Sequence, residues 1–407
     1  MWLVTPILVG LAVFAFDRSE RPDRIVLKDG NEIVCRIMFE DEGRVLFKAK
    51  KKVESIALSK VQEVRSVERS SRAFLDRLSS LSRTSVAELA GLALWAEEHG
   101  LPGEAKALWL RVVLLDATDA EAWGKLDSKR TKTGWRLRLG NRTFTADEFR
   151  GSGRDWRYAI EIPTAHFLVK ANGDLVNALD IAIELESIYS MYYERLGQQI
   201  ELYPFEWIPE IRIHGGGKRA PQPPVSGVDA WYDTKSNVLM VHGDQPQANH
   251  VRRAALDMMI ENSFRMALGN RAGTLPVWAH EGLANEFVLA LRSDSHQLKL
   301  KGGEPYQAWF EAQARMKKKL SIRRVFGSSG SDYGGGTNKL GFRAASYTLV
   351  FYLMNNENDQ YRKAFFDYLR AAFRGKGSLS TFERAFPVPL ETLSKEWNTF
   401  IHETAGV

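Results

Sequence analysis

The side chains able to hold a metal ion or move a proton are few in this chain. It has one cysteine, Cys35, and eight histidines, which are His99, His166, His214, His242, His250, His280, His296 and His402. A single cysteine excludes both an intramolecular disulfide and a cysteine-rich zinc site. Any zinc chemistry would therefore depend on these histidines together with carboxylates.

Four charged residues follow one another at the spacing of a single helical face. Arg253, Asp257, Glu261 and Arg265 are each four residues apart, with the signs plus, minus, minus, plus. Each opposite pair at this spacing contributes about 0.2–0.5 kcal/mol to a helix, and the arginines offset the repulsion between the two carboxylates. The pattern predicts a ladder of internal ion pairs.

The segment from Leu275 to Phe287 has the sequence LPVWAHEGLANEF. It resembles the LPxWLxEGLAxYF motif of gluzincin zinc peptidases, in particular the peptidase MA-like family. Val228–His242 resembles the strand and edge hairpin of that family, Ala345–Leu353 its following helix, and Phe382–Phe400 its C-terminal helices. The resemblance covers about 155–407 and implies a gluzincin-like domain.

The resemblance also implies a metal site, from which this chain departs. Gluzincins carry HExxH on a helix, with two zinc-binding histidines, a general-base glutamate between them, and a third ligand in the EGLA motif. The third position is Glu281, but Asp257 and Glu261 stand at the two histidine positions and Met258 at the general base. No HExxH occurs in the chain. Phe342 or Arg343 stands nearest to the position of the transition-state tyrosine.

These replacements make hydrolysis by the family mechanism unexpected. Met258 cannot accept a proton, and general-base catalysis alone is typically worth about 10²–10⁴-fold. Three carboxylates without imidazole suit Ca²⁺ or Mg²⁺ better than zinc. Asp257, Glu261 and Glu281 therefore form either a carboxylate cation site or part of the ion-pair ladder.

Two histidines lie near these carboxylates in the sequence. His280 adjoins Glu281 on the same helix, where successive side chains point about 100° apart, so the two can hardly share an ion. His250 lies two turns before Asp257, about 10 Å along a helix. It is interpreted as a residue of the helix start.

The elements that must position these residues indicate an α+β protein, since strands come first and helices after. Residues 24–66 predict a small SH3-like β module, with a hairpin turn at Lys28–Asn31. Residues 84–127 predict a short TPR-like helical segment, and 128–154 a linker hairpin. The gluzincin-like domain at 155–407 is expected to open with a small sheet that carries an edge hairpin, and to continue in helices.

The N-terminus predicts export. Trp2 to Phe16 is apolar apart from Thr5 and carries no charge, and about 20 apolar residues would be needed for a membrane span. We therefore interpret 1–16 as a signal peptide or N-terminal anchor, and the protein as periplasmic, attached to the cell envelope or secreted. A net charge of +6 over 407 residues is mild, and nucleic acid is not an expected partner.

The sequence thus predicts a non-catalytic relative of gluzincins that binds a peptide, a protein or an envelope polymer. Trp231 and Tyr232, in the edge hairpin, are the predicted peptide contacts, because gluzincins bind substrate by strand addition. One alternative is a hydrolase with an unusual carboxylate metal site. Another is a structural envelope component. No cofactor is expected, apart from zinc or another divalent cation if Asp257, Glu261 and Glu281 form a working site.

Overall fold

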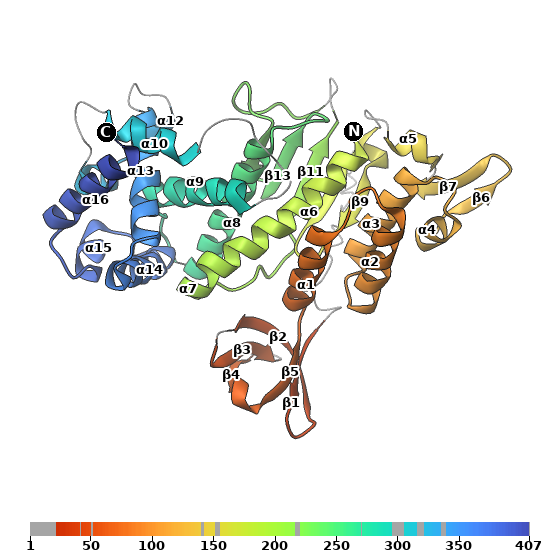
Figure 1. Cartoon of the computed structure of the whole chain (residues 1–407), viewed down its shortest axis with the longest axis horizontal. Helices are drawn as coiled ribbons and strands as arrows, with labels where there is room; N and C mark the ends of the chain where they lie inside the picture. Colours follow the sequence, from red (N-terminus) through yellow and green to blue (C-terminus); the bar gives the residue numbers. More distant parts are fainter. Residues whose placement is uncertain are drawn as a thin grey trace, which may run out of the picture.

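The computed structural model describes residues 22–40, 42–49, 52–139, 142–150, 155–215, 220–269, 271–294, 305–315, 321–334 and 339–406. The predicted signal peptide or anchor at 1–16 lies outside these ranges. The described chain is α+β, as the sequence predicts: an antiparallel five-stranded sheet, helices, a mixed sheet and then a helical C-terminal region (Figure 1). No helix within the described ranges is both long enough and apolar enough to cross a membrane.

The N-terminal sheet, called here the β module, is antiparallel throughout. Its strands are β1 (Asp23–Leu27), β2 (Glu32–Glu40), β3 (Arg44–Ala49), β4 (Lys52–Ala57) and β5 (Val61–Arg65), in the order β4-β3-β2-β1-β5. The hairpin predicted at Lys28–Asn31 joins β1 to β2, with Gly30 at a φ of +86°. The module has its own buried cluster, which includes Ile25, Val45 and Phe47.

A helical segment follows, made of α1 (Val67–Ser80), α2 (Val86–Glu98), α3 (Pro102–Leu115) and α4 (Ala120–Lys125). The last three match the predicted helices, whereas α1 was not anticipated. Ser66 caps α1 by accepting a hydrogen bond from the Arg69 amide. The predicted linker hairpin is a three-stranded sheet of β6 (Lys129–Thr131), β7 (Gly134–Leu139) and β8 (Arg142–Phe144), followed by α5 (Ala146–Arg150).

The central mixed sheet lies behind the long helix α6 (Leu175–Tyr192) in Figure 1. Its strands are β9 (Ile160–Pro163), β10 (Leu168–Ala171), β11 (Glu210–His214), β12 (Ala230–Asp233) and β13 (Val238–His242), in the order β12-β13-β11-β10-β9. Strands β10, β11 and β13 run parallel, while β9 and β12 are antiparallel to their neighbours. The predicted edge hairpin is confirmed, because β12 pairs with β13 and ends the sheet.

The C-terminal region consists of helices, drawn from teal to blue in Figure 1. The long ones are α8 (Ala248–Leu268), α9 (Val277–Asp294), α13 (Lys339–Met354), α14 (Asp359–Phe373) and α16 (Leu390–Ala405). Shorter ones are α10 (Pro305–Ala314), α11 (Ile322–Phe326), α12 (Gly330–Gly334) and α15 (Leu379–Ala385). The short helix α7 (Gln198–Ile200) comes earlier, between α6 and β11. One continuous buried cluster runs from Phe74 in α1 to Ala405 in α16.

Candidate functional site

Helices α8 and α9 pack against each other and bring most of the predicted site residues together. Arg253 and Asp257 lie one turn apart on α8, and His280, Glu281 and Asn285 lie on the facing part of α9. The edge strand β12 packs against α8 as well. The motif LPVWAHEGLANEF therefore places its polar residues opposite the charged face of α8.

Arg253 joins both helices through the three nitrogens of its guanidinium group. Its Nε donates to Asp257 Oδ1 at 3.0 Å, and its Nη1 donates to Asn285 Oδ1 at 3.0 Å. Its Nη2 lies 3.1 Å from Glu281 Oε2. The fork geometry of the guanidinium suits such multiple contacts, so one cation serves two carboxylates on different helices.

Two further groups complete this cluster. His280 Nε2 lies 3.1 Å from Asp257 Oδ1, so the imidazole reaches the carboxylate across the helix pair and not its neighbour Glu281. Arg343, at the start of α13, places its Nε 3.9 Å from Glu281 Oε2. We call Arg253, Asp257, His280, Glu281 and Asn285 the Arg253 network.

The electrostatics of the network favour ionised partners. Burial by itself would raise the pKa of the Asp257 carboxyl, but Arg253 and His280 outweigh it and the pKa is lowered. Burial likewise disfavours the charged Arg253, yet Asp257 and Glu281 raise its pKa overall. The two negative charges are thus compensated internally by a guanidinium that stays protonated.

The third predicted ligand, Glu261, has a different partner. Its Oε1 accepts a hydrogen bond from Arg265 Nε at 3.0 Å. Both outer pairs of the predicted ladder, Arg253–Asp257 and Arg265–Glu261, are therefore present. Met258, at the general-base position of the resemblance, is completely buried.

The donor set does not fit zinc. Asp257 and Glu281 share the Arg253 guanidinium, and zinc favours imidazole or thiolate ligands over carboxylates. Among the residues that the structure describes, no three His, Cys, Asp or Glu side chains are grouped so that they could hold a metal ion. Binding of another divalent cation by Asp257, Glu261 and Glu281 stays a prediction.

The predicted peptide contacts lie on opposite faces of β12. Trp231 is registered with Met240 and points to the outer face of the sheet, partly exposed. Tyr232 faces α8, donates a hydrogen bond to Asn237 Oδ1 at 2.7 Å, and has its pKa raised mainly by burial. The two side chains therefore lie on opposite faces of the sheet and do not form one continuous binding surface.

No further strand pairs with the outer edge of β12 in the part of the chain that the structure describes. Asp229 O accepts a hydrogen bond from His242 N at 2.7 Å, directly before the pair Ala230–Val241. Because backbone groups alternate along an antiparallel pair, Ala230 and Tyr232 direct their N–H and C=O groups away from β13. Ala230 is only 4% exposed, so of these two residues the partly exposed Tyr232 is the one that can offer its backbone groups to an added strand.

Two polar residues at the site were missed at the sequence level. Asn285 follows Glu281 by one helical turn, a spacing that could have identified it. Tyr333 on α12 shares hydrogen bonds with Ser346 (2.7 Å) and Ser328 (3.0 Å), and burial chiefly raises its pKa, with Glu281 adding to the effect. Its segment follows a glycine- and serine-rich stretch with no periodicity that could have placed it.

His250 lies at the start of α8, as its spacing predicts. Its Nδ1 accepts a hydrogen bond from the Asp229 amide at 3.2 Å. It therefore helps to fix the turn before β12.

Comparison with known proteins supplies no further guide. The chain matches no protein-family model, no curated protein and no solved structure. Functional inference therefore rests on the geometry described above.

Proposed function

We propose that this protein is a non-hydrolytic binding protein with a gluzincin-like domain, which holds an extended peptide or protein segment along β12. The observation that carries the proposal is the position of Arg253. Its guanidinium lies between Asp257 and Glu281, two of the three positions that bind zinc in the family this chain resembles. A fixed internal cation has taken the place of a catalytic metal.

Hydrolysis would need a group that activates water, and the chain offers none at the expected place. Met258 has only a thioether and is fully buried in α8. The two carboxylates that could act as bases have lowered basicity or are engaged by Arg253. A peptide could be bound here without a route to cleavage.

The binding mode we propose is strand addition at β12. Among the described residues the strand ends the central sheet, and the partly exposed Tyr232 directs its backbone groups to the side away from β13. Main-chain hydrogen bonds would supply affinity, and side chains beside the strand would supply selectivity. The Arg253 network lies on the helices next to this strand and would form the floor of the binding site.

The experiment alters the peptide and leaves the protein unchanged, so misfolding of a protein variant cannot affect the result. Fluorescent peptides from a casein digest are screened for binding to the full chain by fluorescence anisotropy, both with and without EDTA. The masses of the recovered peptides are then measured by mass spectrometry. We expect bound, intact peptides. The tightest peptide is then N-methylated at alternate backbone positions in either of two registers.

Strand addition predicts that one register abolishes binding and the other preserves it, because only alternate N–H groups face β12. Equal loss in both registers, or binding insensitive to either, would contradict the mode. Cleavage that stops in EDTA would instead favour the alternative, a hydrolase with a metal bound by Asp257, Glu261 and Glu281. Absence of any peptide or protein binding would favour a structural role in the envelope.

Within this proposal the β module is SH3-like and helices α2 to α4 are a TPR-like spacer. Export to the periplasm, the envelope or the medium belongs to the same proposal. It is tested by fractionation of cells that express the full chain with a C-terminal tag.

A further inference from the structure

We propose a second binding site, for a small organic amine with an apolar body, in the cavity between the β module and helices α1 and α6. The cavity measures about 520 Å³, within the range of about 300–1,000 Å³ that is typical of small-molecule sites. It is separate from the Arg253 network, and the inference does not depend on the function proposed above.

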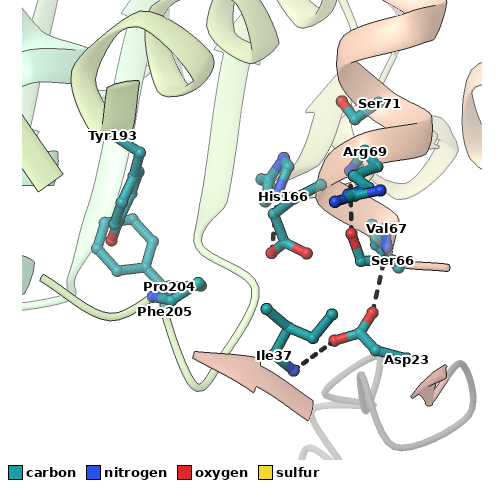
Figure 2. A network of polar contacts seen from close by, with 12 residues as sticks. Asp23, Ile37, Ser66, Val67, Arg69, Ser71, His166, Tyr193, Pro204 and Phe205 are labelled. Atoms are coloured by element: carbon teal, nitrogen blue, oxygen red, sulfur yellow. Dashed lines mark hydrogen bonds and ion pairs between the residues drawn. The ribbon is translucent and has the colours of Figure 1, made fainter. Parts of the chain in front are cut away.

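The walls of the cavity come from three parts of the chain. Ile37, Phe39 and Leu58 belong to the β module, and Tyr189 and Tyr193 to α6 and the turn after it. Figure 2 shows Tyr193 on one side of this space, Ile37 below it, Arg69 on the α1 side and His166 between them. An apolar lining with few polar groups is what a ligand of mixed character requires.

The charged residues of the lining favour a cation. Three glutamates (Glu40, Glu42 and Glu68) stand against two arginines, Arg69 and Arg72. Each arginine is engaged by a carboxylate: Arg69 donates to Glu40, and Arg72 Nε lies 3.7 Å from Glu194 Oε1. The lining therefore has a net negative charge, and its cationic groups are directed to protein partners.

Behind the cavity, a buried histidine lies close to one of these glutamates. His166 Nε2 lies 3.7 Å from Glu68 Oε1, and its Nδ1 lies 2.6 Å from Glu186 Oε2. His166 is 4% exposed and Glu186 2%. Burial would raise the pKa of Glu186, but His166 and further hydrogen bonds lower it. Glu186 is thus ionised and supplies a negative charge beside the imidazole.

The aromatic side chains are also held in fixed positions. Tyr189 stacks on His166 with ring centroids 3.7 Å apart, and Tyr193 lies 4.5 Å from Tyr189. The Tyr193 hydroxyl donates to Tyr203 O at 2.9 Å, which leaves its ring to form a wall. A cation close to the Tyr193 ring and a carboxylate gains from both, so the chemistry selects an ammonium group attached to an aromatic or aliphatic body.

The test compares three probes with one ring system and different charge. Tryptamine is cationic, 3-methylindole is neutral and indole-3-propionate is anionic. Each is titrated into the full chain by isothermal calorimetry, and contacts are mapped by saturation-transfer NMR. We expect tryptamine to bind with a dissociation constant below about 1 mM, 3-methylindole to bind more weakly, and indole-3-propionate not to bind.

Two variants assign the site. Glu68→Gln removes the charge while keeping the shape, and we expect tryptamine binding at least tenfold weaker with 3-methylindole unchanged. The matched control Glu32→Gln changes an exposed glutamate of the same β module, outside the cavity, and should bind as the wild type does. Circular dichroism establishes that each variant is folded.

Tyr193→Leu keeps an apolar wall but removes the aromatic face. It should weaken tryptamine severalfold and leave 3-methylindole little changed. The proposal is overturned if tryptamine fails to bind the wild type, if indole-3-propionate binds equally well, or if folded Glu68→Gln binds tryptamine with unchanged affinity.

Discussion

At the scale of single residues, Arg253 decides what this site can do. A metal ion can leave a protein, whereas a guanidinium on α8 is covalently fixed beside Asp257 and Glu281. Removing one member of such a cluster leaves the others uncompensated, which costs more than the cluster itself contributes. The network should therefore be sensitive to truncation of Arg253 in particular.

We expect Arg253→Ala to lower the free energy of unfolding by about 1–3 kcal/mol. This loss is smaller than for a fully buried ion pair, because solvent still reaches the side chains of Arg253 (25% exposed), Asp257 (29%) and Glu281 (16%). Chemical denaturation measures the loss. The control Arg265→Ala removes only the more exposed contact with Glu261 and should cost about 0–1 kcal/mol. Equal losses of unfolding free energy in the two variants would mean that Arg253 contributes only through its ion pair with Asp257 and not through its contacts with α9.

The same variant tests whether the Arg253 guanidinium occupies a place that a metal ion could otherwise take. Without the guanidinium, the Asp257 and Glu281 carboxylates lose the cation that contacts both of them. We expect added Zn²⁺ or Ca²⁺ to raise the melting temperature of Arg253→Ala and not that of the wild type, since a ligand bound only by the native state stabilises it. A wild-type protein stabilised by either ion would contradict the role given to Arg253.

A second residue-scale prediction concerns Glu104 on α3. Burial, reinforced by the charge of Glu186, raises its pKa to about 7, while an unfolded glutamate titrates near 4.5. Because the native pKa is the higher one, the favourable protonated form is fully present below about pH 4.5 and is lost as the pH rises through about 7.

Glu104→Gln should remove this dependence while keeping an oxygen to accept the Ala165 amide hydrogen bond. Relative to the wild type, we expect the variant to gain about 1–3 kcal/mol in unfolding free energy between pH 5 and pH 8. Urea denaturation at both pH values measures the difference. Parallel pH profiles for the two proteins would show that Glu104 does not titrate in this range.

At the scale of elements, the sequence predicted contacts within one helix or hairpin, but it did not predict which side chains of different helices contact each other. The four-residue spacing of Arg253 and Asp257 predicted their ion pair, and the resemblance over Val228–His242 predicted the edge hairpin. Contacts between Arg253 and Glu281 depend on how α8 crosses α9, which no local pattern encodes. Helix α1 was missed because its apolar residues are sparse, and only a few of them, such as Phe74 and Leu78, are buried.

The crossing of α9 with α13 depends on one glycine. A Cβ at Gly282 would lie 2.5 Å from the Ser346 carbonyl oxygen and 2.5 Å from Val350 Cγ2. A backbone carbonyl cannot move aside cheaply, so Gly282→Ala should destabilise the protein by about 1–3 kcal/mol. The helix α9 would be pushed from α13, and both Arg343 and Glu281 would shift with it.

The control for this substitution is Gly91→Ala in α2, where no atom lies within 4 Å of the added carbon. Alanine is the better helix former by about 0.8–1.0 kcal/mol, so this variant should be slightly more stable than the wild type. Opposite signs in thermal denaturation are expected. A neutral Gly282→Ala would show that α9 and α13 are not packed as closely as this contact requires.

At the scale of the whole molecule, the β module stands apart from the rest (Figure 1). Its buried cluster is separate from the one that runs from α1 to α16. Several of the contacts between the two parts are polar. Asp23 accepts hydrogen bonds from both the Ile37 and the Val67 amides (Figure 2), and Arg36 donates to the carbonyl oxygens of Pro204 and Phe205.

Such an arrangement predicts a module that can detach without unfolding. The double variant Arg36→Gln/Arg69→Gln removes the contacts with Pro204, Phe205 and Glu40. We expect a larger radius of gyration by small-angle X-ray scattering and severalfold faster tryptic cleavage after Arg65, at the start of the connection to α1. Far-UV circular dichroism should hardly change, since both buried clusters are intact.

The control Arg24→Gln breaks an ion pair with Glu32 that lies wholly inside the module and should leave both measurements as in the wild type. Detachment would also open the cavity between the module and α6, so tryptamine binding should fall together with compactness in the double variant. Loss of compactness with unchanged binding would place the amine elsewhere. Unchanged compactness and cleavage would mean that apolar contacts such as those of Ile37 and Leu202 around the cavity, rather than the arginines, hold the module in place.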